Sequence, residues 1–87
     1  MKTNSPVKLD LFQKNINLAT TVANELYVKE NNPYIEREDL LQEALIGLCE
    51  AIDNYDNNMD IKLSKHINSY VNRELNSYIK RIKSYKR

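Results

Sequence analysis

Residues 37–56 read REDLLQEALIGLCEAIDNYD and have the pattern of an amphipathic α-helix. At 100° per residue one broad face is apolar, and it consists of Leu41, Ala44, Leu45, Leu48, Ala51, Ile52 and Tyr55. The opposite side is acidic with one isoleucine, and it comprises Asp39, Gln42, Glu43, Ile46, Glu50 and Asp53. Gly47 costs a helix interior about 1 kcal/mol relative to alanine, so we expect a second backbone to approach it closely.

Two further segments have helical spacing. The first runs from Pro6, with Ser5 as its expected cap, to about residue 30, before the breaker Asn31-Asn32-Pro33. The last follows a polar connection, with Ser64 as its expected cap, and its apolar positions are Ile67, Tyr70, Val71, Leu75, Tyr78, Ile79, Ile82 and Tyr85. We predict an all-α fold for residues 1–87 as a single domain, a small bundle of three main helices at approximately 6–30, 36–55 and 64–86. An extra short helix near Pro33-Tyr34 is an optional addition.

Composition argues against an enzyme. The chain has 87 residues with one glycine, one cysteine and one histidine, which leaves little room for a deep catalytic pocket or a glycine-rich phosphate loop. His66 has no second histidine or cysteine at metal-ligand spacing, so we expect no metal and no cofactor. The lone Cys49, expected as a half-buried apolar residue, favours a reducing compartment. No apolar run is long enough for a membrane span, and there is no secretion signal, so we expect a cytoplasmic protein.

Charge is strongly segregated along the chain. Residues 31–56 carry seven acidic side chains against Arg37, whereas residues 57–87 carry eight basic side chains against Asp60 and Glu74. Such segregation favours two partners of opposite charge, one of them a nucleic acid. The alternative is that the acidic and basic helices face each other within the bundle.

The last helix has a basic stripe interleaved with asparagines, which is the composition that phosphate and base-edge contacts require. The stripe includes Lys65, Asn68, Asn72, Arg73, Asn76, Lys80, Lys83 and Arg87. His66 and Tyr70 add planar rings that could stack on an exposed base. A solvated charged face is the simpler interpretation of the same stripe. For the acidic helix, Ile46 ringed by carboxylates is typical of a patch that binds a basic protein.

An acidic helix followed by a basic one resembles region 2 of the bacterial sigma-70 family of transcription initiation factors. The pattern Asp-Leu-Leu-Gln-Glu-x-x-x-Gly-Leu-x-x-Ala-x-x-x-Tyr over residues 39–55 carries the resemblance, with further matches at Asn17-Leu18, residues 34–38, Lys62, Ser64 and Ile79. It implies that the acidic helix docks on the clamp helices of the RNA polymerase β′ subunit. The implied contacts are Asp39, Gln42, Glu43, Leu45, Ile46 and Cys49.

The resemblance also implies contact with the promoter −10 element, on the non-template strand. The implied positions, together with Lys80 from the basic stripe, are Lys62, Leu63, Lys65, His66, Asn68, Ser69, Tyr70, Asn72, Arg73 and Asn76. Family members that open promoters unaided carry an aromatic cluster here, where this chain has Leu63, His66 and Ser69 and keeps only Tyr70. We therefore expect weaker melting or a changed promoter element, because aromatic stacking offsets the cost of unstacking a base.

The 87 residues contain no counterpart of the family's domain that reads the −35 element. If they are the whole protein, we expect a second subunit to supply those contacts or the contacts to be dispensed with. The alternative is that they are a piece trimmed from a longer factor. Phage-type sigma factors and two-component sigma systems are suitable comparisons. A polymerase-binding regulator that competes with host sigma without reading DNA is the alternative function. A helical scaffold with no polymerase partner is a third.

Overall fold

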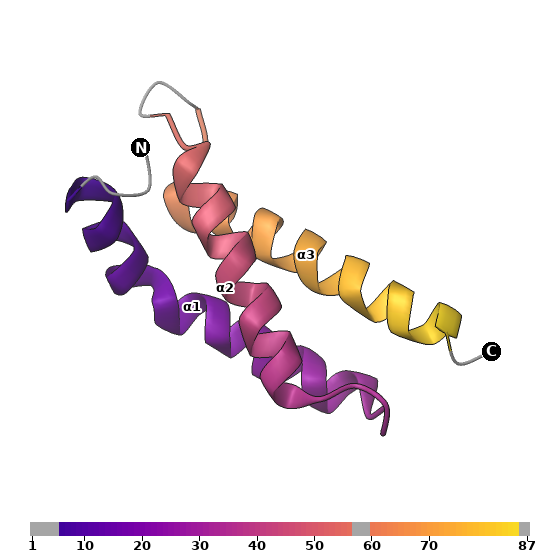
Figure 1. Ribbon diagram of the computed structural model, residues 1–87. Helices are drawn as coiled ribbons and strands as arrows, with labels where there is room; N and C mark the ends of the chain where they lie inside the picture. Colours follow the sequence, from indigo (N-terminus) through magenta and orange to yellow (C-terminus); the bar gives the residue numbers. More distant parts are fainter. Residues whose placement is uncertain (1–5, 57–59, 86–87) are drawn as a thin grey trace.

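The computed structural model describes residues 6–56 and 60–85, and these form three α-helices without a strand. The helices are α1 (Pro6–Glu30), α2 (Arg37–Asp53) and α3 (Leu63–Tyr85). Figure 1 shows α2 crossing between the other two, and α2 packs extensively against both, whereas α1 and α3 contact each other much less. The all-α prediction is confirmed. The helix ends lie within two residues of the expected ones.

The connection between α1 and α2 is a tight turn, not an additional helix. Asn31 adopts a positive φ of 49°, a conformation that asparagine tolerates better than most residues, and its amide donates to the Tyr27 carbonyl at 3.2 Å, which ends α1. The Ile35 amide then donates to the Asn32 carbonyl at 3.0 Å. The optional short helix near Pro33-Tyr34 is therefore absent, because this turn uses its backbone groups.

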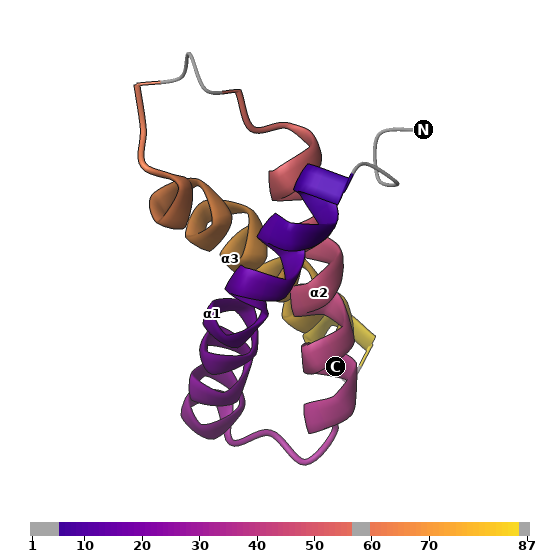
Figure 2. The same cartoon turned by 90° about the vertical axis from the view of Figure 1, so that its left-hand side faces the viewer.

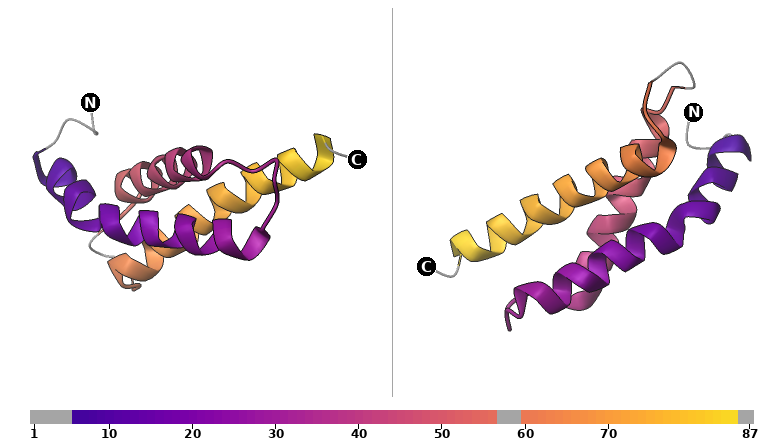
Figure 3. Two further views of the ribbon diagram at one scale, coloured as in Figure 1. Left: turned by 90° about the horizontal axis from the view of Figure 1, so that it is seen from below. Right: turned by 180° about the vertical axis from the view of Figure 1, so that it is seen from behind.

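The beginnings of the helices differ in part from expectation. α3 begins at Leu63, one residue before Ser64, so Ser64 lies inside the helix and does not cap it as predicted. Glu38 and Asp39 occupy the first turn of α2, where the helix dipole favours negative charge. The expected cap at Ser5 lies outside the described residues. Figures 2 and 3 show that the first turns of α1 bend relative to the rest of that helix.

The core lies where α2 meets the other two helices. Its largest fully buried side chains are Leu40, Leu48, Ile67, Val71 and Leu75. The sequence pattern had placed Leu41 on the apolar face and had left out Leu40, but Leu40 is fully buried and Leu41 is only half-buried. The reason is that small residues, Ala44 and Ala51, mark the true centre of the face that α2 turns to its neighbours.

Gly47 marks the closest approach of α2 to α3. A Cβ atom built on Gly47 would lie 2.9 Å from Cα of Val71 and 3.0 Å from the carbonyl oxygen of Tyr70. Both atoms belong to the backbone and cannot turn aside. The prediction of a close backbone contact at Gly47 is confirmed, and this contact sets how α3 is held against α2.

Candidate functional site

The acidic side of α2 forms one outward face, which we call the α2 face and define by the six residues implied above. Asp39, Gln42, Ile46 and Cys49 are exposed, whereas Glu43 and Leu45 are half-buried at its two edges. Ile46 is 46% exposed and lies near the middle of the face. The structure therefore brings the six residues together on the side of α2 that turns away from the core.

The edge of the α2 face nearest α3 is already in contact with that helix. The Tyr78 hydroxyl donates to Asp39 at 3.0 Å, and the Arg81 guanidinium lies 3.8 Å from Glu43. Burial of Tyr78 and its hydrogen bond to Asp39 raise the pKa of this tyrosine to about 12. The charged sides of α2 and α3 thus touch along one edge, which we call the seam. They are not buried face to face, because most of the α2 face stays exposed.

A second point on the seam crowds two carboxylates. Burial raises the pKa of Glu50, and the neighbouring charge of Glu74 and a hydrogen bond with it raise the pKa further, while Arg73 opposes the shift. Glu50 is on α2 and Glu74 on α3, so acidic groups from both helices meet beside a cation of the basic stripe.

Cys49 is exposed on the α2 face, and the expectation of a half-buried residue is therefore wrong. It sits on the side of α2 that faces the first turns of α1, where the two helices leave it open. Burial of its sulfur raises the pKa of the Cys49 thiol, as do the charges of Asp53 and Glu50. A thiol with a raised pKa is neutral near pH 7, so Cys49 acts as a small apolar side chain and not as a nucleophile.

The basic stripe of α3 forms a second outward face, which we call the α3 face. Its exposed members are Lys62, Lys65, Asn68, Ser69, Arg73, Asn76 and Lys80, and Tyr70 and Asn72 are half-buried at its border. The Asn72 amide donates to the Asn68 carbonyl one turn earlier at 2.8 Å. Asn72 therefore presents mainly its side-chain carbonyl, since its amide donor is already engaged.

His66 is the site residue that the structure places differently. It is 4% exposed, and its Nε2 lies 2.8 Å from the Ala51 carbonyl of α2. Because a carbonyl oxygen can only accept, Nε2 carries the proton and donates. The expectation that the His66 ring is free to stack on a base is corrected. The ring instead ties the start of α3 to the end of α2.

The buried histidine belongs to a row of side chains that contact one another. Its ring centroid lies 5.3 Å from that of Tyr55 and 4.8 Å from that of Tyr70. Arg73 continues the row, with its guanidinium carbon 4.6 Å from the Tyr70 ring centroid. His66 lies four residues before Tyr70, which was one of the apolar positions of this helix, and residues four apart share a helix face. That spacing was the signal that could have shown the histidine packing inward.

The described residues offer neither a metal site of clustered ligands nor a membrane-spanning helix. Within 6–56 and 60–85, no group of three or more His, Cys, Asp or Glu side chains could hold a metal ion. Over the same ranges, none of the helices combines the length and the apolar character needed to cross a bilayer. The described residues do present the two charged faces and a small apolar groove beside the α2 face.

Comparison with known families gives one match. The family model described as sigma-70 region 2 matches residues 11–85, a range that includes all of α2 and α3 and most of α1. A search of curated individual proteins finds no match.

Proposed function

The chain belongs to the sigma-70 region 2 family, and on this basis we propose that it acts in transcription initiation by binding core RNA polymerase through the α2 face and promoter DNA through the α3 face. The observation that carries the proposal is the presentation of the two faces. Opposite charges occupy the outer sides of two different helices, and contacts between the charged sides, such as those of Asp39 with Tyr78 and Glu43 with Arg81, lie along the seam. Both faces can therefore meet a partner at the same time.

The α2 face suits the β′ clamp helices as a partner. Ile46 supplies an apolar anchor at its centre, and carboxylates around it favour a basic helix with arginines able to form paired hydrogen bonds. Asp39 and Glu43 already bind side chains of α3, so the most accessible polar residue of the six is Gln42. A partner helix would replace the weak contacts of Asp39 and Glu43 with α3 by contacts of its own, and it would bury Ile46.

The α3 face suits the phosphate backbone and bases of the −10 element. Lys62, Lys65 and Lys80 are exposed cations that can neutralise phosphates and release counterions. Tyr70, half-buried under Arg73, is the aromatic side chain best placed to meet a base on the non-template strand. His66 has no part in this contact, because its ring is buried against α2.

The second candidate is a regulator that occupies the clamp-helix site and excludes host sigma without reading DNA. It is favoured by the burial of His66 together with Leu63 and Ser69 at positions where the family stacks bases. The α2 face suits both functions, so the α3 face discriminates between them.

Site-specific photocrosslinking distinguishes the two functions. We expect a photoreactive residue at Arg73 to label the non-template strand in a promoter complex formed with core polymerase. The matched control is the same residue at Glu25, an exposed position on α1, which should give no DNA adduct. Polymerase binding without any DNA adduct from position 73 would favour the competing regulator. Absence of polymerase binding would refute both.

A further inference from the structure

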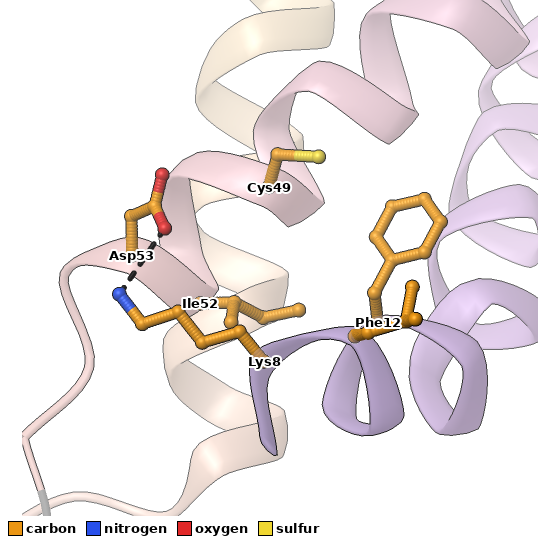
Figure 4. A pocket seen from close by; sticks show the side chains of 6 residues that line it. Lys8, Phe12, Cys49, Ile52 and Asp53 are labelled. Atoms are coloured by element: carbon orange, nitrogen blue, oxygen red, sulfur yellow. Dashed lines mark hydrogen bonds and ion pairs between the residues drawn. The ribbon is translucent and has the colours of Figure 1, made fainter. Parts of the chain in front are cut away.

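A small apolar groove lies between the first turns of α1 and the last turns of α2. It has a volume of about 240 Å³ and is lined by Lys8, Leu9, Phe12, Cys49, Ile52 and Asp53. Figure 4 shows Cys49 above and Phe12 to the right, with Ile52 below Cys49, between the Lys8–Asp53 pair and Phe12. The Lys8 ammonium, 3.2 Å from an Asp53 carboxylate oxygen, closes one end. The groove is therefore apolar along its length and charged only at that end.

The groove continues the α2 face onto α1. Cys49 belongs to both, and Leu45 lies one turn before it on the same side of α2. On the α1 side of the groove, Leu9 is 55% exposed. Leu45, Cys49 and Leu9 thus form an apolar strip that runs from one helix to the other. The raised pKa of the Cys49 thiol keeps this strip uncharged near neutral pH.

Size and charge identify what could occupy the groove. Its volume is below the range of about 300–1,000 Å³ that is usual for small-molecule sites, so it fits a single protruding side chain better than a cofactor. Of the acidic residues of α2, Asp53 lines the groove and pairs with Lys8. The others, Asp39, Glu43 and Glu50, lie on the side of α2 toward α3 and favour a basic partner for the α2 face, which the groove continues. An apolar side chain carried on a basic helix satisfies both conditions.

We infer that the groove between Phe12 and Cys49 receives an apolar side chain from the same basic helix that docks on the α2 face, so that the docking surface includes the start of α1. The inference rests on the proposed function, since that helix is the proposed polymerase partner. Burial of Leu9 and Cys49 adds apolar area beside Ile46, and an apolar centre within a charged rim is the usual arrangement of a strong interface. The Lys8–Asp53 ion pair, which closes one end of the groove, would then mark the limit of the surface that the partner covers.

Leu9→Asp tests the groove, because Leu9 is exposed and its replacement leaves the core intact. We expect the affinity of the full chain for core RNA polymerase to fall by about tenfold, which corresponds to about 1.4 kcal/mol. The matched control is Val28→Asp, the same change at a 75% exposed aliphatic residue near the other end of α1, and it should change affinity by less than about twofold. Equal affinity of the Leu9→Asp chain and the wild type would overturn the inference while leaving the proposed function intact.

A labelling experiment tests coverage of the groove directly. The only cysteine is first replaced by Cys49→Ser, and a thiol is then introduced by Leu9→Cys or, as the control, by Val28→Cys. Core polymerase should slow maleimide labelling at position 9 by about tenfold or more and leave position 28 unchanged, because a covered thiol reacts slowly. Unchanged labelling at position 9 in a complex that still forms contradicts the inference. Labelling of the free chain at position 9 that becomes faster when residues 1–5 are removed also contradicts the inference. That result would mean that residues 1–5, and not a partner, cover the groove. If no complex forms with the wild type, it is the proposed function that fails.

Discussion

The α2 face and the α3 face are both charged, but they differ in how many of their side chains already make contacts within the protein. On α2, Ile46, Gln42 and Cys49 are exposed, and the contacts to α3 are confined to one edge. On α3, two of the groups that could read a base are engaged within the molecule, since Asn72 donates to Asn68 and Tyr70 lies under Arg73, while Asn76 is exposed. The α2 face is thus ready for a protein partner, whereas the α3 face offers nucleic acid mainly its cations.

The difference has a physical consequence for recognition. Contacts between cations and phosphates position a protein on DNA but carry little sequence information. Reading a base through Asn72 or Tyr70 would first require breaking a contact that the free protein already makes. We therefore expect polymerase binding to be the tighter and more specific of the two interactions, and the variants below are chosen to test that ranking.

The largest effect is expected at Gly47, on which the arrangement of both faces depends. Gly47→Leu forces a side chain against the backbone of Val71 and should lower the free energy of unfolding by about 3 kcal/mol, measured by urea denaturation. The control, Gln42→Leu, adds a similar side chain on the exposed side of the same helix and should change stability by about 0.5 kcal/mol or less. Similar midpoints for the two variants would mean that α2 and α3 are not held by this contact.

Ile46→Lys should weaken polymerase binding without unfolding the chain. The change removes an apolar anchor and places a positive charge against a basic partner, so we expect the affinity for core polymerase to fall by about thirtyfold, an effect of about 2 kcal/mol. Its control is Val28→Lys on α1, exposed to a greater extent, which should bind as the wild type does. DNA binding by the isolated chain should be equal for both, and a loss there would show that the two faces are not independent.

His66→Phe separates structure from recognition on α3. Phenylalanine keeps a ring but cannot donate to the Ala51 carbonyl, so unfolding should become easier by about 1–2 kcal/mol. The affinity of the folded protein for single-stranded promoter DNA should stay the same, because the His66 ring is buried. A loss of DNA affinity at a temperature where the variant is fully folded would return His66 to the set of base contacts.

Tyr78→Phe gives the smallest effect and appears only at high pH. In the folded chain the Tyr78 pKa is raised from 10.0 to about 12, so the neutral hydroxyl stabilises the fold below pH 10. That contribution is lost as the pH rises through the folded pKa. We expect the unfolding free energy of the wild type to fall more steeply between pH 10 and 12 than that of the variant. Parallel curves would mean that Tyr78 is neither buried nor bonded to Asp39 in solution.

Much of the fold and the family could be predicted from the sequence because the signals are local. Gly47 is an example, since a glycine that weakens a helix interior predicts a close contact wherever the partner lies. The all-α architecture, the resemblance to sigma-70 region 2 and the ends of α1 also followed from spacing and breakers. The contacts of the α2 and α3 faces with polymerase and DNA remain predictions.

The positions of His66, Cys49 and Leu40 could not be predicted in the same way. Each has a place in a helical pattern, but its burial depends on which neighbouring helix covers it. His66 is buried because the end of α2 passes over it, and Cys49 is exposed because α1 leaves an open groove beside it. The groove beside Phe12 depends on the same fact, since its walls come from residues about forty positions apart in the chain.

The sequence by itself determined that this protein is three amphipathic helices with acidic charge on one and basic charge on the next, because periodicity and charge are properties of neighbouring residues. Only the tertiary structure decided which of those charges are free. The contacts of Asp39 and Glu43 with α3, and the hydrogen bond from His66 to the Ala51 carbonyl, join two helices whose distance from each other is smallest at Gly47. That distance depends on residues far apart in the chain, so no local pattern contains it.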